Sequence, residues 1–248
     1  MRLLVSVRAA AEVAPALAGG ADIVDAKEPA RGSLGAVSLE VLREIAALVP
    51  ATVPLSVALG DFTTEGPARD AARESLAVLD GFPRRAPLYL KLGFAGERLP
   101  AAVADIIATA IEVADAAPSR PVIVAVAYAD HENAGSPEPE AVLGAAVASG
   151  ARALLLDTWL KDGRALFSWT GIDRLQSLAA EARAAGMLVA LAGSLDLDST
   201  ELARRFADVI GVRGAACRGG REGSVDPDLV RGLAVRLRAG FQSPAPVG

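Results

Sequence analysis

Three lysines stand out in a chain that takes almost all of its positive charge from arginine. Of the 25 basic residues, only Lys27, Lys91 and Lys161 are lysines. A guanidinium stays protonated, whereas a lysine amine can lose its proton when it is desolvated. A neutral amine can attack an aldehyde or ketone and form a Schiff base. These lysines are therefore the first candidates for chemistry that arginine cannot do, although most lysines are solvated surface charges.

Two aspartates accompany the lysines at informative spacings. Asp25 lies two residues before Lys27, so on a strand both side chains would project to the same side. Burial and a second cation such as Lys91 would lower the pKa of Lys27, whereas Asp25 would favour its charged form. We expect Lys27 to be the nucleophile, Lys91 a general base and Asp25 an orienting group or proton relay. The alternative is a purely structural ion pair between Asp25 and Lys27. Asp157 is expected in acid/base work, and Lys161 either binds a phosphate or is solvated.

Two glycine-containing segments near the C-terminus are typical of phosphate binding. They are LAGS and GVRGAAC, which contain Gly193 and Ser194, and Arg213 and Gly214. Glycine lets backbone N–H groups approach an anion closely, and the serine adds a hydroxyl. We expect these four residues to hold a phosphate group. Arg213 could instead pair with an internal carboxylate.

The elements that must position these residues follow a strand-then-helix repeat. Short apolar runs predict strands at 3–7, 22–26, 53–59, 88–92, 122–127, 153–157, 188–192 and 208–212. Alanine-rich stretches predict helices at 9–18, 38–48, 67–79, 100–114, 137–148, 171–184, 199–206 and 227–239. Eight such units favour a single α/β domain, a closed (β/α)8 TIM barrel, over an open doubly wound sheet. We expect the catalytic domain to span 1–240 and a loose tail to follow at 241–248.

The active site of such a barrel lies at the carboxyl ends of its strands. All three lysines fall at or just after a predicted strand end, and so do the two phosphate-binding segments. We therefore expect them to meet at one mouth. His131 lies in a polar loop at the same end, where it is either solvated or in contact with substrate.

Composition excludes several other classes of protein. A net charge of -5, with 52% hydrophobic residues, argues against disorder and against a nucleic-acid binder. The single cysteine, Cys217, excludes an internal disulfide, and the single histidine makes a metal site or a Ser-His-Asp triad improbable. We expect no membrane span and no signal peptide, and hence a cytoplasmic enzyme. A homo-oligomer stays open, because helix 137–148 could pack on another subunit or on its own barrel.

Eight short blocks resemble, in order, those of one enzyme family. They are DIVDAKEP (22–29), GSLGA (32–36), YLKLG (89–93), AYAD (127–130), LDT (156–158), KDG (161–163), LAGS (191–194) and GVRGAAC (211–217). Together they resemble the (5-formylfuran-3-yl)methyl phosphate synthase family, also called 4-(hydroxymethyl)-2-furancarboxaldehyde-phosphate synthase, of methanofuran biosynthesis. Any one block would be weak, but the whole set in register is specific. The resemblance extends to about residue 239.

The resemblance implies an enzyme that joins two molecules of glyceraldehyde 3-phosphate into a phosphorylated furan aldehyde, with loss of phosphate and water. It implies that Lys27 forms the Schiff base, that Lys91 accepts a proton, and that Asp25, Asp157 and Lys161 lie around them. Such an enzyme would be a carbon–oxygen lyase that needs no metal or organic cofactor. The alanine- and arginine-rich composition is more typical of methylotrophic bacteria than of methanogens.

Two other functions remain open from the residues alone. A Schiff-base aldolase of the deoxyribose-phosphate type also uses a barrel and paired lysines, but it makes no furan. A non-catalytic sugar-phosphate-binding barrel would bind a phosphate ester without forming a covalent adduct.

Overall fold

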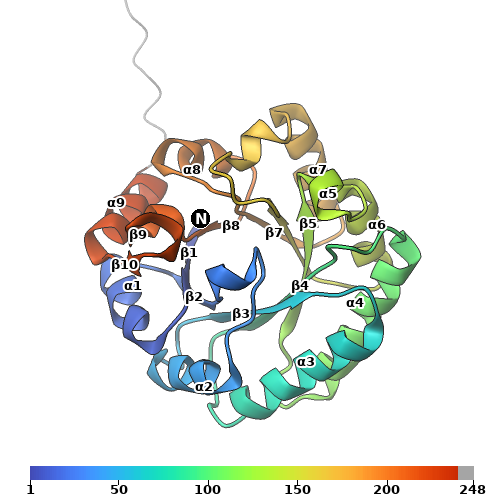
Figure 1. Ribbon diagram of the computed structural model, residues 1–248, viewed down its shortest axis with the longest axis horizontal. Helices are drawn as coiled ribbons and strands as arrows, with labels where there is room; N and C mark the ends of the chain where they lie inside the picture. Colours follow the sequence, from blue (N-terminus) through green and yellow to red (C-terminus); the bar gives the residue numbers. More distant parts are fainter. Residues whose placement is uncertain (240–248) are drawn as a thin grey trace, which may run out of the picture.

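The computed structural model describes residues 1–239, so the predicted loose tail at 241–248 lies outside the described residues. Within this range, eight parallel strands close into one barrel, and the last strand pairs with the first. The strands are β1 (Arg2–Val7), β2 (Ile23–Ala26), β3 (Leu55–Asp61), β4 (Leu88–Gly93), β5 (Val122–Tyr128), β6 (Ala153–Asp157), β7 (Leu188–Leu191) and β8 (Val209–Val212). Figure 1 shows them at the centre of a ring of helices. The predicted (β/α)8 barrel is confirmed.

The outer ring contains a counterpart for every predicted helix, with ends that differ by a few residues. These helices are α1 (Val13–Gly19), α2 (Leu39–Leu48), α3 (Glu65–Leu79), α4 (Pro100–Ala116), α6 (Pro139–Ala148), α7 (Ile172–Ala184), α8 (Leu197–Ala203) and α9 (Pro227–Arg238). A short extra helix, α5 (His131–Ala134), lies in the loop that was predicted to be irregular. A two-stranded sheet, β9 (Cys217–Arg218) with β10 (Ser224–Val225), forms in the loop after β8.

Local sequence signals explain where several elements begin and bend. Ser38 accepts a hydrogen bond from the N–H of Val41 at the start of α2, and Asp226 caps α9 in the same manner. In β3 the register with β4 shifts between Ala58 and Gly60, and Gly60 has a φ of +122°. Glycine adopts this conformation without strain, so the bulge lets β3 run two residues beyond its predicted end.

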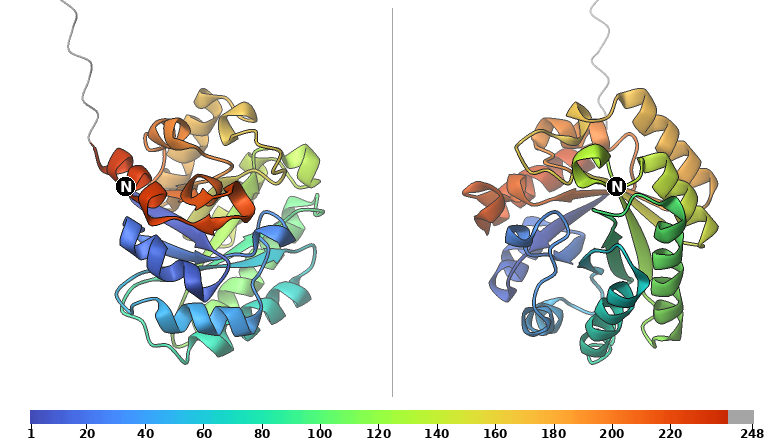
Figure 2. Two further views of the ribbon diagram at one scale, coloured as in Figure 1. Left: turned by 60° about the vertical axis from the view of Figure 1, so that its left-hand side comes forward. Right: turned by 45° about the vertical axis from the view of Figure 1, so that its right-hand side comes forward.

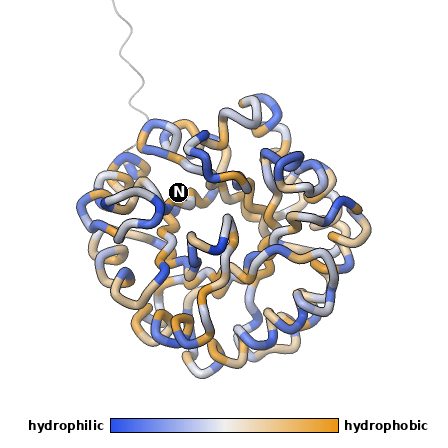
Figure 3. Tube along the Cα trace, viewed as in Figure 1, coloured by the Kyte–Doolittle hydropathy of each residue, from blue (hydrophilic) through white to orange (hydrophobic). Residues whose placement is uncertain are grey.

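The end of the described chain packs against its beginning and closes the ring. Figure 2 shows α9, in red, beside α1, in blue. A Cβ at Gly19 would collide with the side chain of Val230, so glycine permits this close contact. In Figure 3 the helices alternate between hydrophilic and hydrophobic residues, as expected for helices with one face on a barrel. Within residues 1–239, no helix combines the length and the apolar character that crossing a membrane requires.

Candidate active site

A cavity of about 310 Å³ opens at the carboxyl ends of the strands and continues into the barrel. Small residues on the inner wall leave this space: Ser6, Ser56, Ala190, Ala192 and Gly211. The predicted site residues Lys27, Lys91, Asp25, Asp157, Lys161, Gly193, Ser194, Arg213 and Gly214 all line it. The structure thus brings together every residue that the sequence proposed for the site.

Lys27 lies at the centre of this group, directly after β2. Its backbone N–H donates to the carbonyl of Val7 at 3.0 Å, and the residue is only 6% exposed. Burial, and next the charge of Lys91, lower the pKa of Lys27 from its ordinary 10.5 to about 7, against the opposing effect of Asp157 and Asp25. Among the described residues, no carboxylate lies within ion-pair distance of its amine. Lys27 can therefore be a neutral nucleophile near neutral pH.

Asp25 pairs with Lys91 rather than with its sequence neighbour Lys27. The Lys91 Nζ lies 2.6 Å from Asp25 Oδ1, and the hydroxyl of Ser6 donates to Asp25 Oδ2 at 2.7 Å. Burial alone would raise the pKa of Asp25, but Lys91 and then Lys27 outweigh it and hold the pKa below its usual range. The alternative of an Asp25–Lys27 pair is therefore wrong. Asp25 and Lys91 thus form a buried ion pair beside Lys27.

A second lysine–aspartate pair also acts on the charge of Lys27. Lys161 Nζ lies 2.8 Å from Asp157 Oδ1 and donates to the hydroxyl of Thr158 at 3.2 Å. Asp157 also accepts hydrogen bonds from the N–H of Thr158 and the hydroxyl of Ser33. Burial opposes ionisation, but Lys161 and then Lys27 lower the pKa of Asp157 to about 2. Asp157 is thus a fixed carboxylate at neutral pH, and Lys161 is not freely solvated.

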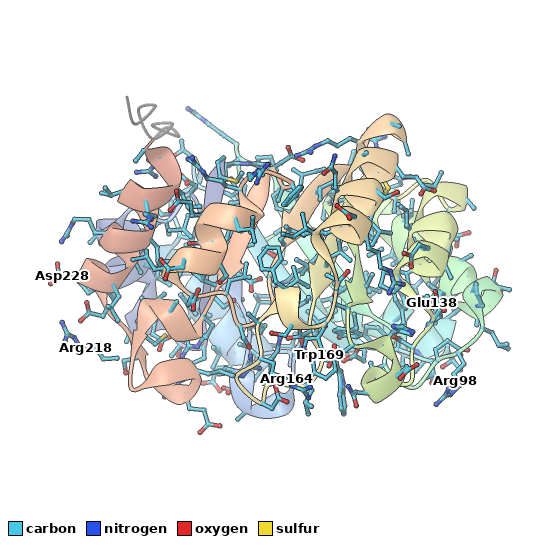
Figure 4. The ribbon with its side chains drawn as sticks, turned by 90° about the horizontal axis from the view of Figure 1, so that it is seen from above. Arg98, Glu138, Arg164, Trp169, Arg218 and Asp228 are labelled. Carbon is cyan, nitrogen blue, oxygen red and sulfur yellow. The ribbon has the colours of Figure 1, made fainter. Side chains whose placement is uncertain are left out.

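The loop after β6, which carries this second pair, is anchored at both ends. The carboxylate of Asp130 accepts hydrogen bonds from the N–H groups of Trp159 and Leu160 at 2.7 and 2.8 Å. The guanidinium of Arg164 stacks 3.7 Å from the ring centre of Trp169. Figure 4 shows these two side chains close together at one edge of the barrel. The AYAD block therefore contributes to the site indirectly, because its Asp130 positions this loop.

The loop after β7 presents free backbone donors to the cavity. Gly193 has a φ of +103° and Ser194 a φ of +51°. Left-handed backbone costs a non-glycine residue energy, and such strain is concentrated at functional sites. A Cβ at Gly193 would lie 3.0 Å from the side chain of Thr158, so a larger residue here would have to displace Thr158 as well as adopt left-handed backbone. The described residues offer no acceptor to the N–H groups of Gly193 and Ser194. Successive free amides of this kind form an anion-binding concavity.

Arg213 is occupied by an internal carboxylate. It forms an ion pair of 2.6 Å with Glu12, which lies in a short 3₁₀ turn after β1, and its five N–H groups all have acceptors. These acceptors are Glu12, Ser6, Arg221 and Gly223. The predicted phosphate contact of Arg213 therefore has no donor left, and the alternative, a pair with an internal carboxylate, describes this residue.

Sequence reasoning missed three contributors and left two residues outside the site. Glu12 and Arg221 lie outside every motif, and Ser33 lies in the GSLGA block without having been singled out, yet each contacts a cavity residue or lines the cavity. His131 begins α5 and is not among the residues that line the cavity. Cys217 is buried, and its burial raises the pKa of the thiol. A raised pKa is unfavourable for a nucleophilic cysteine.

Comparison with known proteins places this site in a family. A family model described as 4-HFC-P synthase matches residues 3–234. The (5-formylfuran-3-yl)methyl phosphate synthase of Methanothermobacter thermautotrophicus is 36% identical over 236 residues, which cover 94% of this chain and 97% of the relative. The synthase of the same name from Methanocaldococcus jannaschii is 32% identical and covers 94% and 98%.

Solved structures share the barrel at much lower identity. N-(5'-phosphoribosyl)anthranilate isomerase from Pyrococcus furiosus aligns with a TM-score of 0.62 at 14% identity, over 96% of this chain and 98% of that one. A 3-hexulose-6-phosphate synthase aligns with a TM-score of 0.58 at 18% identity, over 95% and 99%. These likenesses show the fold alone. The family model and the curated relatives go further, because they extend along nearly the whole chain, and by them the chain belongs to the 4-HFC-P synthase family.

Proposed function

We propose that this enzyme condenses two molecules of glyceraldehyde 3-phosphate, through a Schiff base on Lys27, into (5-formylfuran-3-yl)methyl phosphate for methanofuran biosynthesis. The observation that carries the proposal is the environment of Lys27. It is a buried amine with a pKa near 7, without an ion-pair partner in the described chain, between two lysine–aspartate pairs. The names of the relatives support the product, and the lysine supports the route to it. The chemistry is that of a lyase, since a carbon–oxygen bond to phosphate is broken.

The first step is attack of the neutral Lys27 amine on the aldehyde carbon of one triose phosphate. The resulting carbinolamine must lose its hydroxyl as water, and this departure needs an acid. Lys91 is suited to donate that proton, because it enters as the protonated member of its pair with Asp25. The products of the step are an iminium ion on Lys27 and a neutral amine on Lys91.

The second step uses the iminium as an electron sink. The now neutral Lys91 takes the proton from the carbon next to the iminium, so it becomes the base that the sequence suggested. The enamine that forms attacks the aldehyde carbon of the second triose phosphate. One phosphate and two further molecules of water then leave during elimination and ring closure, and aromatisation of the furan drives the sequence forward. Hydrolysis of the imine takes up one water, breaks the bond to Lys27 and releases the aldehyde, so that the overall reaction loses one phosphate and two molecules of water.

The second lysine–aspartate pair and the free amides can supply the further proton transfers and the phosphate contacts. Asp157 and Lys161 line the same cavity as Lys27 and Lys91, where they can exchange protons with hydroxyl groups of the incoming triose. The free N–H groups of Gly193, Ser194 and Gly214 line the same cavity and suit a phosphate oxygen. These contacts describe a site for a phosphorylated aldehyde.

The decisive experiment is trapping. Incubation with glyceraldehyde 3-phosphate and cyanoborohydride, followed by peptide mass spectrometry, should give a mass increment on Lys27. Without reductant, a product that absorbs in the near ultraviolet should accumulate. An adduct without a furan product would instead support the aldolase of the deoxyribose-phosphate type. Binding without any adduct would support the non-catalytic barrel and overturn the proposal.

A further inference from the structure

Among the residues that the structure describes, Arg221 is the permanent cation at the cavity with no carboxylate in ion-pair distance. The cations that line the cavity are Lys27, Lys91, Lys161, Arg213 and Arg221. Lys91, Lys161 and Arg213 each pair with a carboxylate. The residues of the described chain place no carboxylate within 4.0 Å of Arg221. Lys27 is needed as a neutral amine, so Arg221 alone has a full charge to offer an anionic ligand.

The hydrogen bonds of Arg221 leave part of its guanidinium free. Its Nη2 donates to the carbonyl oxygens of Pro29 and Gly32, at 3.2 and 2.6 Å. The described chain provides no acceptor for Nε or Nη1, so three of the five N–H groups remain available. A guanidinium with free donors and no partner charge matches a phosphate oxygen in both charge and geometry.

Neighbouring residues hold Arg221 in position. It lies in a 3₁₀ turn (Gly220–Glu222), whose backbone is held by Arg213 through hydrogen bonds to the carbonyls of Arg221 and Gly223. Gly214 lies directly beside it, because a Cβ there would be 3.7 Å from the Arg221 nitrogen. Its own contacts reach Pro29 and Gly32, in the loop that follows Lys27. Arg221 thus connects the free amide of Gly214, after β8, with the loop that follows Lys27.

We propose that Arg221 binds the phosphate group of the triose that forms the Schiff base, with Gly214 beside it, and that Arg213 positions Arg221 rather than touching the substrate. This inference rests on the proposed function for the identity of the phosphorylated aldehyde. A phosphate monoester carries about -1.5 to -2 charges at neutral pH. Because the other permanent cations of the cavity are paired with carboxylates, binding this charge requires an unpaired cation such as Arg221.

The test compares a phosphorylated with an unphosphorylated aldehyde in the same trapping assay. In R221Q, the concentration of glyceraldehyde 3-phosphate that half-saturates cyanoborohydride trapping on Lys27 should rise by about tenfold to a hundredfold, the usual size of a charged hydrogen bond. The half-saturating concentration of plain glyceraldehyde should not change. R221K should lie between the two. The matched control is R218Q, since Arg218 is in the same loop but its side chain is 71% exposed and pairs with Asp226; Figure 4 shows it on the outer side of the molecule.

Each outcome decides the inference separately from the proposed function. Unchanged half-saturation for glyceraldehyde 3-phosphate in R221Q overturns it. Equal weakening for both aldehydes also overturns it, because Arg221 would then only support the loop. If the wild type forms no adduct, the proposed function fails. Inorganic phosphate then tests Arg221 alone: it should raise the melting temperature of the wild type and of R218Q but not of R221Q, and an equal rise in R221Q overturns the inference.

Discussion

Two lysine–aspartate pairs border Lys27, and they are built differently. The Asp25–Lys91 pair joins the barrel strands β2 and β4, with side chains 0% and 5% exposed and 2.6 Å between the charged atoms. The Asp157–Lys161 pair joins residues four apart at the end of β6 and in its loop, with side chains 2% and 14% exposed and 2.8 Å between the atoms. We call them the strand pair and the loop pair.

From this difference we propose different parts for the two pairs in the proposed reaction. Strands cannot move relative to one another without disrupting the barrel, so the strand pair is rigid and suits steps that need exact alignment with the Lys27 amine. The loop pair is local and nearer to solvent, so it suits contacts with a substrate that enters later. The strand pair is also the more desolvated, and its loss should therefore be the more costly.

Breaking the strand pair should have the largest effect. In Lys91→Met the acid and base of both early steps are lost, so kcat should fall roughly 10²- to 10⁴-fold. Asp25 would remain buried without its partner, which should lower the free energy of unfolding by about 3 kcal/mol. Steady-state rates and urea unfolding measure the two effects. The double variant Asp25→Asn, Lys91→Met should regain stability but not activity; an active double variant would contradict the assignment.

The pH at which Lys27 trapping is half-maximal should also distinguish the two pairs. Lys27 must be neutral to attack, and with a pKa of about 7 its trapping rate should rise about tenfold per pH unit below pH 7 and level off above it. Lys91 is the main charged cause of the lowered pKa, whereas Lys161 is the weakest of the named causes. Lys91→Met should therefore move the midpoint upward by more than Lys161→Met does. Equal midpoints in both variants would refute this ranking.

The lowered pKa of Lys27 also makes the unfolding free energy of the protein depend on pH. Lys27 titrates at about 7 in the folded protein and at its ordinary 10.5 when unfolded. Its contribution to stability is thus complete above pH 10.5, is lost progressively as the pH falls from 10.5, and is gone once the pH has passed 7. Relative to Lys27→Met, the wild type should gain up to about 1.4 kcal/mol of unfolding free energy per pH unit between these values. Urea unfolding of both proteins across this range measures the gain, and parallel stabilities would speak against a buried amine.

The convergence of the site was predictable from the order of the strands. Lys27, Lys91 and Asp157 lie on or directly after β2, β4 and β6. In a (β/α)8 barrel, inward residues of alternate strands share one layer, so strand ends of equal parity meet. Counting strands was therefore enough to place these residues at one mouth. Lys161 follows because it lies one short loop beyond Asp157.

The partners within the site could not be predicted in this way. Neighbours on one strand project in parallel rather than toward each other, so Asp25 meets Lys91 from β4 and not Lys27. Arg213 meets Glu12 because the barrel closes between β8 and β1, which brings together residues 201 positions apart. Arg221 lies in a turn without any motif of its own. Pairing depends on side-chain direction and closure, and a one-dimensional pattern contains neither.

Breaking the loop pair should have a smaller effect than breaking the strand pair. In Lys161→Met, kcat should fall by about tenfold, because proton exchange with the second triose is impaired but the Schiff base still forms. Asp157 keeps the hydrogen bonds from Thr158 and Ser33, so the loss of unfolding free energy should be smaller than in Lys91→Met, at about 1 to 2 kcal/mol. Single-turnover trapping on Lys27 should be nearly normal, while multiple-turnover formation of furan is slow. A trapping defect as large as that of Lys91→Met would remove the distinction between the pairs.

The smallest effects are expected when the serine hydroxyl that donates to the aspartate of each pair is removed. Ser6 donates to Asp25 at 2.7 Å, and Ser33 donates to Asp157 at 3.2 Å and to the carbonyl of Thr158 at 2.9 Å. Each aspartate keeps its lysine when the serine becomes alanine, so each change should cost only about 1 kcal/mol of stability and a few-fold in rate. Ser6→Ala should slow single-turnover trapping, because it loosens the strand pair beside Lys27. Ser33→Ala should leave trapping unchanged and slow only turnover, since the loop pair acts after the Schiff base has formed. If the two variants instead affect the same step, the pairs act as one unit rather than in sequence.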